Sequence, residues 1–426
     1  MAAARRTALS GLSKNTYLLA FASLFSDIST EMLYPVLPVF LTETLGAKPA
    51  VLGVVEGIAQ ALQNIIQGFS GWLSDKLKRR KPVALVGYFM AALAKPFIGL
   101  STTWTEVLAA RSVDRLGAGS RSAPRDALIA ASASEKDRGK AFGLEGIGDN
   151  LGAFLGPLIT ILLVASFHVE LRTIFLLSVI PGLIAAIMVL LVREKHVAVA
   201  SKAKLDVNIR RFPRAYWKYL LVILLFSLGN SSNTFLILRT KNLGAPLTTT
   251  ILIYAFFNLV AALASFPAGY LSDKLGRKGV LLVSFLVFAF VYGSFGFATH
   301  VAVLGALFML YGLYQGIFRA VGKALATDFL PPELHASGIG WYTATVGLAT
   351  LVASLVAGQL WTRVGPPAAF IFGAVFGVLG TLALITLVPG RGDPMKLDRH
   401  RAEKEEGPRD SQWSHLCPLE KAPPVQ

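Results

Sequence analysis

Two carboxylates interrupt the first long apolar stretch of the chain. Asp27 and Glu31 lie four positions apart between residues 16 and 42, so a helix would place both on one face. Charged groups in an apolar setting are costly, and they usually face a cavity and pair with a base. A partly desolvated carboxylate beside an arginine can gain and lose a proton as its surroundings change. We therefore interpret Asp27 and Glu31 as candidate proton-binding groups, with a static ion pair as the alternative.

Other polar residues form stripes at helical spacing within later apolar segments. One stripe consists of Arg111, Asp114, Arg115, Arg121 and Arg125, with Asp126 next to the last of these. A second consists of Glu56, Gln60, Gln63 and Gln67, and a third segment carries Glu145 and Asp149. At about 1.5 Å per residue, counted from opposite ends, Asp27 and Arg115 both fall near the middle of an apolar layer about 30 Å thick.

The second part of the chain offers mainly neutral polar groups. These groups are Asn230, Ser231, Ser232 and Asn233 in one segment, and Tyr311, Tyr314 and Gln315, with the bases Arg319 and Lys323, in another. Tyrosine and asparagine side chains that face a cavity suit an amphiphilic solute, although they can also hold two helices together. The contrast predicts proton chemistry mostly in the first half and substrate contacts mostly in the second.

Composition points to a membrane protein. Of the 426 residues, 54% are hydrophobic and 15% are charged, whereas soluble proteins carry about 25% charged residues. The net charge of +16 could indicate a nucleic-acid partner, but the basic residues stand in short clusters between apolar runs, so we expect none. The single cysteine, Cys417, excludes a disulfide framework, and the six histidines form no Cys/His cluster that predicts a metal site. Without a catalytic constellation or a phosphate-binding loop, we expect neither an enzyme nor a cofactor.

Twelve segments are long and apolar enough to cross a bilayer as helices, which takes about 20 residues each. They lie near 16–42, 50–73, 83–101, 105–131, 140–166, 172–192, 217–242, 247–271, 279–298, 301–329, 335–361 and 367–388. The first is too long for the apolar core of a signal peptide and is interpreted as an uncleaved helix.

Basic residues predict the orientation of these helices. Lysines and arginines cluster after the even-numbered segments, so the positive-inside rule places both chain ends in the cytoplasm, with the protein in the cell membrane (the inner membrane if bacterial). The predicted organisation is an N-terminal segment (1–15), a six-helix bundle (16–192), a cytoplasmic linker (193–216), a second six-helix bundle (217–388) and a tail (389–426) predicted to be disordered.

A duplication relates the two predicted bundles. The run GWLSDKLKRRK at 71–81 recurs as GYLSDKLGRKG at 269–279, with seven of eleven positions identical and an offset of 198 residues. The same offset maps Arg121 onto Arg319 and Arg125 onto Lys323. A repeat of six helices returns the chain to the same side, so it predicts two parallel halves around a central site.

The repeated run carries groups that suit a gate. Gly71 and Gly269 would let a neighbouring helix approach closely. Asp75 and Asp273 lie where a helix leaves the membrane, and there they can accept charge-assisted bonds from Arg79 and Arg277. We interpret these residues, with Arg121, Arg125 and Asp126, as a cytoplasmic gate; the alternative is that the bases only set the topology.

This pair of loops resembles the signature loop of the major facilitator superfamily, and the chain looks like a 12-helix transporter of the bacterial efflux type. The resemblance implies an all-α membrane fold of two parallel six-helix pseudo-repeats, working as a secondary transporter. It also implies that the first, fourth, seventh and tenth helices line the cavity. On that basis Asp27–Arg115 and Glu31–Arg111 are predicted as ion pairs.

The fifth segment carries a glycine stripe, Gly148, Gly152 and Gly156, followed by Pro157. The glycines permit close helix packing, and the proline can bend the helix. The stripe resembles the fifth-helix signature of proton-coupled exporters of the superfamily, although Thr160 and Ile161 stand where that pattern ends in a glycine pair.

We therefore predict a monomeric antiporter that exports a small organic compound or drug in exchange for protons. One alternative is import or exchange of an anionic metabolite, for which the arginines of 105–131, with Arg319 and Lys323, could hold a carboxylate or phosphate. The other is a membrane receptor or scaffold that transports nothing. The expected partners are the small-molecule substrate, protons and the lipid bilayer.

Overall fold

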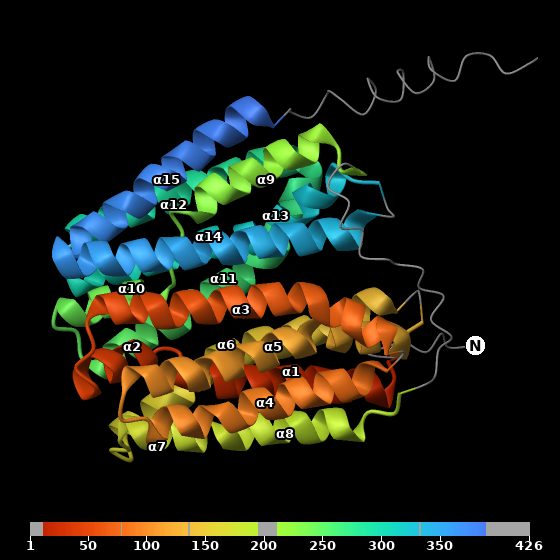
Figure 1. Ribbon diagram of the computed structural model, residues 1–426, viewed down its shortest axis with the longest axis horizontal. Coiled ribbons are helices and arrows are strands. Elements are labelled where there is room, and N and C mark those ends of the chain that lie inside the picture. Colours follow the sequence, from red (N-terminus) through yellow and green to blue (C-terminus); the bar gives the residue numbers. More distant parts are fainter. Residues whose placement is uncertain (1–11, 78, 135–136, 195–210, 332–333, 389–426) are drawn as a thin grey trace, which may run out of the picture. The chain divides into compact units, whose positions relative to one another are not determined.

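The computed structural model describes residues 12–77, 79–134, 137–194, 211–331 and 334–388, and this part of the chain contains helices and no strand (Figure 1). The helices are α1 (Lys14–Leu33), α2 (Leu37–Val39), the π-helical η1 (Phe40–Thr44), α3 (Pro49–Lys76), α4 (Arg80–Leu100), α5 (Trp104–Ser132), α6 (Arg138–Ala165), α7 (Leu171–Leu177), α8 (Val179–Leu191), α9 (Arg214–Ser227), α10 (Thr234–Asn242), α11 (Leu247–Leu275), α12 (Arg277–Phe297), α13 (Val301–Asp328), α14 (His335–Arg363) and α15 (Pro366–Leu387). The predicted all-α fold is confirmed.

The helices form twelve segments of membrane-spanning length, at the predicted places in the chain. Within the described residues, ten of them contain a stretch that is long and apolar enough to cross a bilayer. The eleventh, α5, is long enough but carries the charged stripe. The remaining segment is the one predicted as a continuous helix over 217–242. The prediction of a continuous helix is wrong, because α9 ends at Ser227 and α10 begins at Thr234.

Polar residues fill the break between α9 and α10. The Ser232 amide donates to Ser354 Oγ of α14 at 3.1 Å, and Ser232 Oγ accepts from the Thr234 hydroxyl at 2.9 Å. The Thr234 amide also donates to Ser232 Oγ at 3.4 Å, so side chains satisfy the amides of Ser232 and Thr234 where the helix is interrupted. Irregular backbone at membrane depth is tolerated where protein or a cavity surrounds it, and this break lines a cavity.

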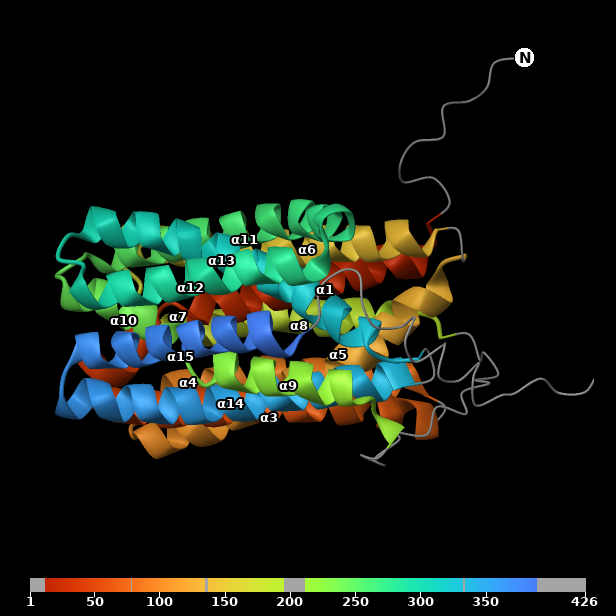
Figure 2. The same ribbon diagram turned by 90° about the horizontal axis from the view of Figure 1, so that it is seen from above.

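The two halves, α1–α8 and α9–α15, repeat the same packing. In the first half α1 packs on α6, α3 on α5, and α4 on α8; in the second α9 packs on α14, α11 on α13, and α12 on α15. The halves meet along α3 against α14 and along α6 against α11 (Figures 1 and 2). The structure therefore confirms two parallel six-helix pseudo-repeats.

The two ends of the bundle differ in charge and in closure. At one end, here called the basic end, α1 starts, α3 stops and the bases Lys14, Arg80, Lys81, Arg277 and Lys278 gather. At the opposite end polar contacts join the halves: Lys241 to Glu43 at 3.5 Å, and the Ala50 amide to Thr362 Oγ1 at 2.9 Å. There α3 and α14 also approach so closely that a Cβ on Gly53 would lie 2.2 Å from the Ser354 carbonyl oxygen. This end is closed.

Candidate functional site

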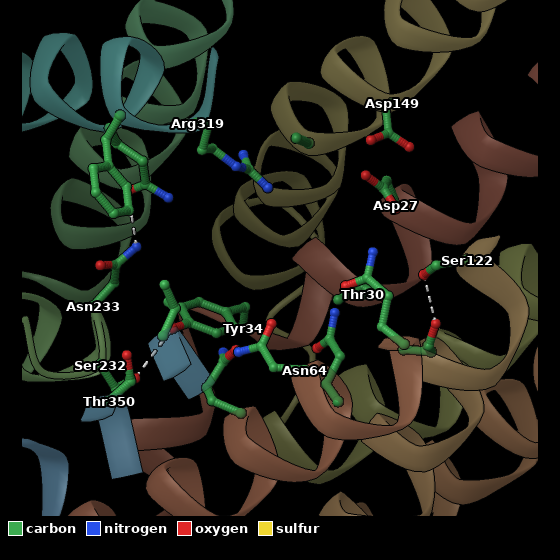
Figure 3. Close-up of a pocket in the computed structure, with 18 of the residues that line it drawn as sticks. Asp27, Thr30, Tyr34, Asn64, Ser122, Asp149, Ser232, Asn233, Arg319 and Thr350 are labelled. Carbon is green, nitrogen blue, oxygen red and sulfur yellow. Dashed lines mark hydrogen bonds between the residues drawn. The ribbon is translucent and has the colours of Figure 1, made fainter. Parts of the chain in front are cut away.

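A polar cavity of about 490 Å³ lies between the halves. It is lined from the first half by α1, α3, α5 and α6, and from the second by α11, α13, α14 and the break between α9 and α10 (Figure 3). Ligand cavities typically measure about 300–1,000 Å³, so it has room for a small organic molecule. Of the sequence candidates, Asp27, Glu31, Arg115, Arg121, Arg125, Asn230, Asn233, Tyr311, Tyr314, Gln315 and Arg319 line it.

Asp27 lies in the first-half wall with its side chain 26% exposed. Arg121 of α5 approaches it at 4.0 Å and also donates to Ser26 Oγ. Figure 3 shows Asp149 of α6 facing Asp27 across a short gap. Two carboxylates that line the cavity therefore face each other, with Arg121 beside Asp27.

Arg125 gathers three carboxylates one turn nearer the basic end. Its guanidinium lies 3.0 Å from Asp126, 3.0 Å from Glu145 and 3.6 Å from Asp149. The sequence assigned Arg125 and Asp126 to one gate, whereas the contacts of Arg125 with the two α6 acids were not expected. Three carboxylates therefore share this one base.

The glycine stripe of α6 holds α1 in place. A Cβ on Gly148, Gly152 or Gly156 would lie 2.5–2.8 Å from the carbonyl oxygens of Ala20, Leu24 and Ile28. The predicted close packing is thus present, and its partner is the helix that carries Asp27 and Glu31. Pro157 follows the stripe inside α6 and is buried.

Gly152→Ala tests this packing. The added Cβ would meet the Leu24 carbonyl at 2.5 Å and Asp27 Cβ at 2.9 Å, so α1 must shift. Overpacking typically costs about 1–3 kcal/mol, and we expect a loss of that size in the free energy of unfolding. Thermal unfolding of the purified protein measures it. Gly146→Ala on the same helix is the matched control, because a Cβ there meets open space; equal effects of the two changes would contradict the prediction.

Glu31 connects the two halves. It accepts hydrogen bonds from Tyr254 Oη at 2.9 Å and Asn258 Nδ2 at 3.4 Å, both on α11. The predicted pairs Glu31–Arg111 and Asp27–Arg115 are wrong, because Glu31 bonds to α11 and Asp27 lies next to Arg121. Arg111 and Arg115 have the expected depth, but their side chains bond to α3 and not to α1.

Arg111 and Asp114 do not line the cavity, contrary to the sequence prediction. Both are buried in a chain of ion pairs between α3 and α5. Arg111 binds Glu56 at 2.8 Å and Asp114 at 2.7 Å, and Arg115 binds Asp114 at 2.9 Å. Arg115 then donates to Gln63 Oε1 at 3.0 Å, where the chain reaches the cavity wall.

Sequence reasoning missed one buried base, Lys95 of α4. Its amine donates to Ser29 Oγ at 2.5 Å and Thr30 Oγ1 at 3.3 Å on α1. Thr30 lines the cavity, so Lys95 supports the wall from behind. A single lysine inside an otherwise apolar segment was the available signal.

The second-half wall is held by neutral hydrogen bonds. Tyr311 Oη donates toward Asn233 Oδ1 at 2.8 Å, and Asn233 Nδ2 donates to Gln315 Oε1 at 3.2 Å. Asn230 Oδ1 lies 3.2 Å from the same tyrosine hydroxyl. The Tyr314 ring packs beside that of Tyr311, with centroids 5.1 Å apart. The wall thus combines amide groups with aromatic surface.

The proposed gate is only partly described. Asp273 accepts from Arg277 at 3.4 Å, and Arg277 also binds Asp328 and the Ala324 carbonyl. The predicted close approach at Gly269 is wrong, since a Cβ there would meet nothing within 4 Å. The backbone N–H of Arg79 donates to Ser74 O at 3.3 Å. Gly71 and the Asp75 side chain lie outside the described residues.

Two facing six-helix halves around a polar cavity are the architecture of a membrane transporter. The family model of the Major Facilitator Superfamily matches residues 19–238 and again residues 219–420. An uncharacterized MFS-type transporter of Methanocaldococcus jannaschii is 33% identical over 380 residues, covering 88% of this chain and 95% of that protein. The chain belongs to the major facilitator superfamily, whose members are membrane-embedded transporters of small molecules.

Solved structures show the same fold. A mutant form of the nucleoside transporter NupG matches with a TM-score of 0.76 and 13% identity, covering 88% of this chain and 100% of that one. The human organic anion transporter MFSD10 matches with a TM-score of 0.63 and 18% identity, covering 87% and 99%. At these identities the likeness concerns the fold and not the substrate.

Proposed function

We propose that the protein is a secondary active transporter that exports a small organic compound in exchange for protons. The observation that supports this proposal most directly is the position of Asp27. Its carboxylate lies in the cavity wall, 4.0 Å from Arg121 and facing Asp149, and its side chain is 26% exposed. A proton on Asp27 would relieve the repulsion from Asp149, whereas loss of the proton would favour the contact with Arg121. The substrate could shift this balance by excluding water or by competing for the arginine.

The pattern of closure suggests one stage of alternating access. The opposite end is closed by Lys241–Glu43 and by Tyr34 against Ser232 at 3.3 Å, while Asp126 and Asp149 nearer the basic end are 46% and 40% exposed. We propose that the basic end faces the cytoplasm, in keeping with the positive-inside rule, and that the cavity opens toward it. Access from the other side would require the contacts at the opposite end to break.

Two features favour an antiporting exporter that works as a monomer. The glycine stripe of α6 resembles that of proton-coupled exporters, and it packs on the helix that carries Asp27. One chain contributes both walls of the cavity, so a second copy is not needed to complete it. In this scheme the gate residues at the basic end hold the cytoplasmic side closed when the cavity is open toward the opposite end.

Everted membrane vesicles from cells that express the chain test this function. Respiration acidifies the vesicle interior, and a pH-sensitive dye reports the gradient. Uptake of an exported compound should release protons and partly collapse the gradient, because entry into an everted vesicle corresponds to export. Vesicles that accumulate compounds with the gradient unchanged would contradict proton coupling. If vesicles with and without the chain behave alike across cationic, neutral and anionic compounds, the protein is a scaffold.

A further inference from the structure

Two bases on α13, Arg319 and Lys323, form what we call the basic pair. They lie one helical turn apart, both line the cavity, and both are exposed to it. Figure 3 shows the Arg319 guanidinium reaching from the second-half wall into the space in front of Asp27 and Asp149. The basic pair is thus presented to whatever occupies the cavity.

Comparison with the first half shows that the basic pair lacks the carboxylate partners of its counterparts. Its counterparts 198 residues earlier, Arg121 and Arg125, contact Asp27 of α1 and Glu145 of α6. In the second half the equivalent helices α9, α10 and α14 contain no carboxylate, and Thr343 and Gly347 stand 198 positions after Glu145 and Asp149. The second half therefore repeats the two bases of α5 but not the acids that pair with them.

No ion pair within the described ranges involves either member of the basic pair. Two carboxylates of the facing wall attract it over longer distances, but both are already bonded. Asp126 pairs with Arg125 at 3.0 Å, and Glu31 accepts from Tyr254 at 2.9 Å. The basic pair keeps its capacity to bind an anion.

A role in orienting the helices in the membrane does not explain the position of Arg319. It lies nine residues before the end of α13 at Asp328, which corresponds to about 13 Å from the basic end and places it near the middle of a layer about 30 Å thick. A base at that depth is costly and marks a functional site by default. An entering anion would compensate it through charge-assisted hydrogen bonds.

The surroundings of the basic pair indicate the rest of the ligand. Gln315 lies one turn before Arg319 on the same face, and its amide group can bond a second polar atom. Tyr311, Tyr314 and Phe318 line the cavity next to it with the edges of largely buried rings, and the rings of Tyr314 and Phe318 stack with centroids 5.8 Å apart. A flat, apolar body would pack there beside its charged head.

We propose that the basic pair binds the oxyanion head, such as a carboxylate, of a small aromatic organic anion, and that this is the substrate class of the cavity. This proposal rests on the proposed export function and narrows it. Exporting one monovalent anion for one proton would move two charges in the same electrical direction, so transport would be driven by the membrane potential as well as by the pH gradient.

Three probes with one aromatic body separate the head groups: 2-naphthoate, 2-naphthamide and 2-naphthylmethylammonium. Calorimetric binding to the purified full-length protein should be about tenfold or more tighter for naphthoate than for the other two, the gain typical of a hydrogen bond to a charged group. Arg319→Gln and Lys323→Gln should each weaken naphthoate binding about tenfold and leave naphthamide binding unchanged. Arg319→Lys should recover part of the loss.

Arg363→Gln is the matched control, because Arg363 is an exposed base at the far end of α14, away from the cavity. Size-exclusion profiles and unchanged naphthamide binding exclude misfolding of the variants. Naphthoate binding no tighter than that of naphthamide, or equal losses in Arg363→Gln and Arg319→Gln, would overturn the proposal.

Transport of naphthoate in everted vesicles separates this proposal from the proposed function. If binding depends on the basic pair but uptake leaves the pH gradient unchanged at a clamped membrane potential, the anion site stands and proton-coupled export is wrong. If uptake collapses the gradient but binding is indifferent to the charge of the head, export stands and the anion site is wrong.

Discussion

Asp27→Asn is expected to abolish proton-driven accumulation of substrate while sparing substrate binding. The amide keeps the size of the carboxylate and removes its proton chemistry, so the contact with Arg121 at 4.0 Å can no longer exchange with a protonated state. Downhill exchange of substrate should persist, because it needs only the conformational change. The measurement is proton release from purified protein on adding substrate, wild type against variant.

Two further variants define the role of Asp27. Glu31→Gln should be milder, because a neutral amide oxygen can still accept from Tyr254 at 2.9 Å. Glu170→Gln, an exposed acid before α7 at the opposite end, is the control and should release protons like the wild type. If Asp27→Asn also releases protons like the wild type, Asp27 is a structural partner of Arg121, and Asp149 becomes the next candidate.

Arg111→Met is expected to cause the largest loss of stability. Arg111 is buried between Glu56 at 2.8 Å and Asp114 at 2.7 Å. Removing one member of a buried ion pair typically costs about 3–5 kcal/mol, because the remaining charge is left without compensation. In this variant the Glu56 carboxylate would have no ion-pair partner, whereas Asp114 would still pair with Arg115 at 2.9 Å. Thermal unfolding and the folded fraction after purification measure the loss.

The double change Arg111→Met with Glu56→Leu is the matched control. It removes both charges of one pair, and replacing a buried pair by apolar side chains is often neutral. We therefore expect it to recover most of the stability that the single change loses. A single variant as stable as the wild type, or a double variant less stable than the single one, would show that the pair does not hold α3 to α5.

The number of segments, the duplication and the position of the cavity residues along their helices were all predictable from the sequence. Hydropathy is summed over a local window, and the repeated run at 71–81 and 269–279 is visible without a structure. The close packing of Gly148, Gly152 and Gly156 was predictable for the same reason, since the spacing of the stripe is local. The break between α9 and α10 was not, because Asn230 to Asn233 read equally well as cavity residues of a continuous helix.

The tertiary structure alone decided which charges pair. Counting residues gives the depth of a side chain along its helix, but not the rotation of that helix toward one neighbour or another. Arg111 and Arg115 have the predicted depth and yet bind Glu56 and Asp114, because that face of α5 packs on α3. For the same reason Arg121, and not Arg115, approaches Asp27. The basic pair on α13 lacks an ion-pair partner among the described residues for a different reason, because α9, α10 and α14 contain no carboxylate. The sequence thus determined the bilayer-spanning framework and its inventory of charges, whereas helix rotation in the packed bundle determined which of those charges remain available in the cavity.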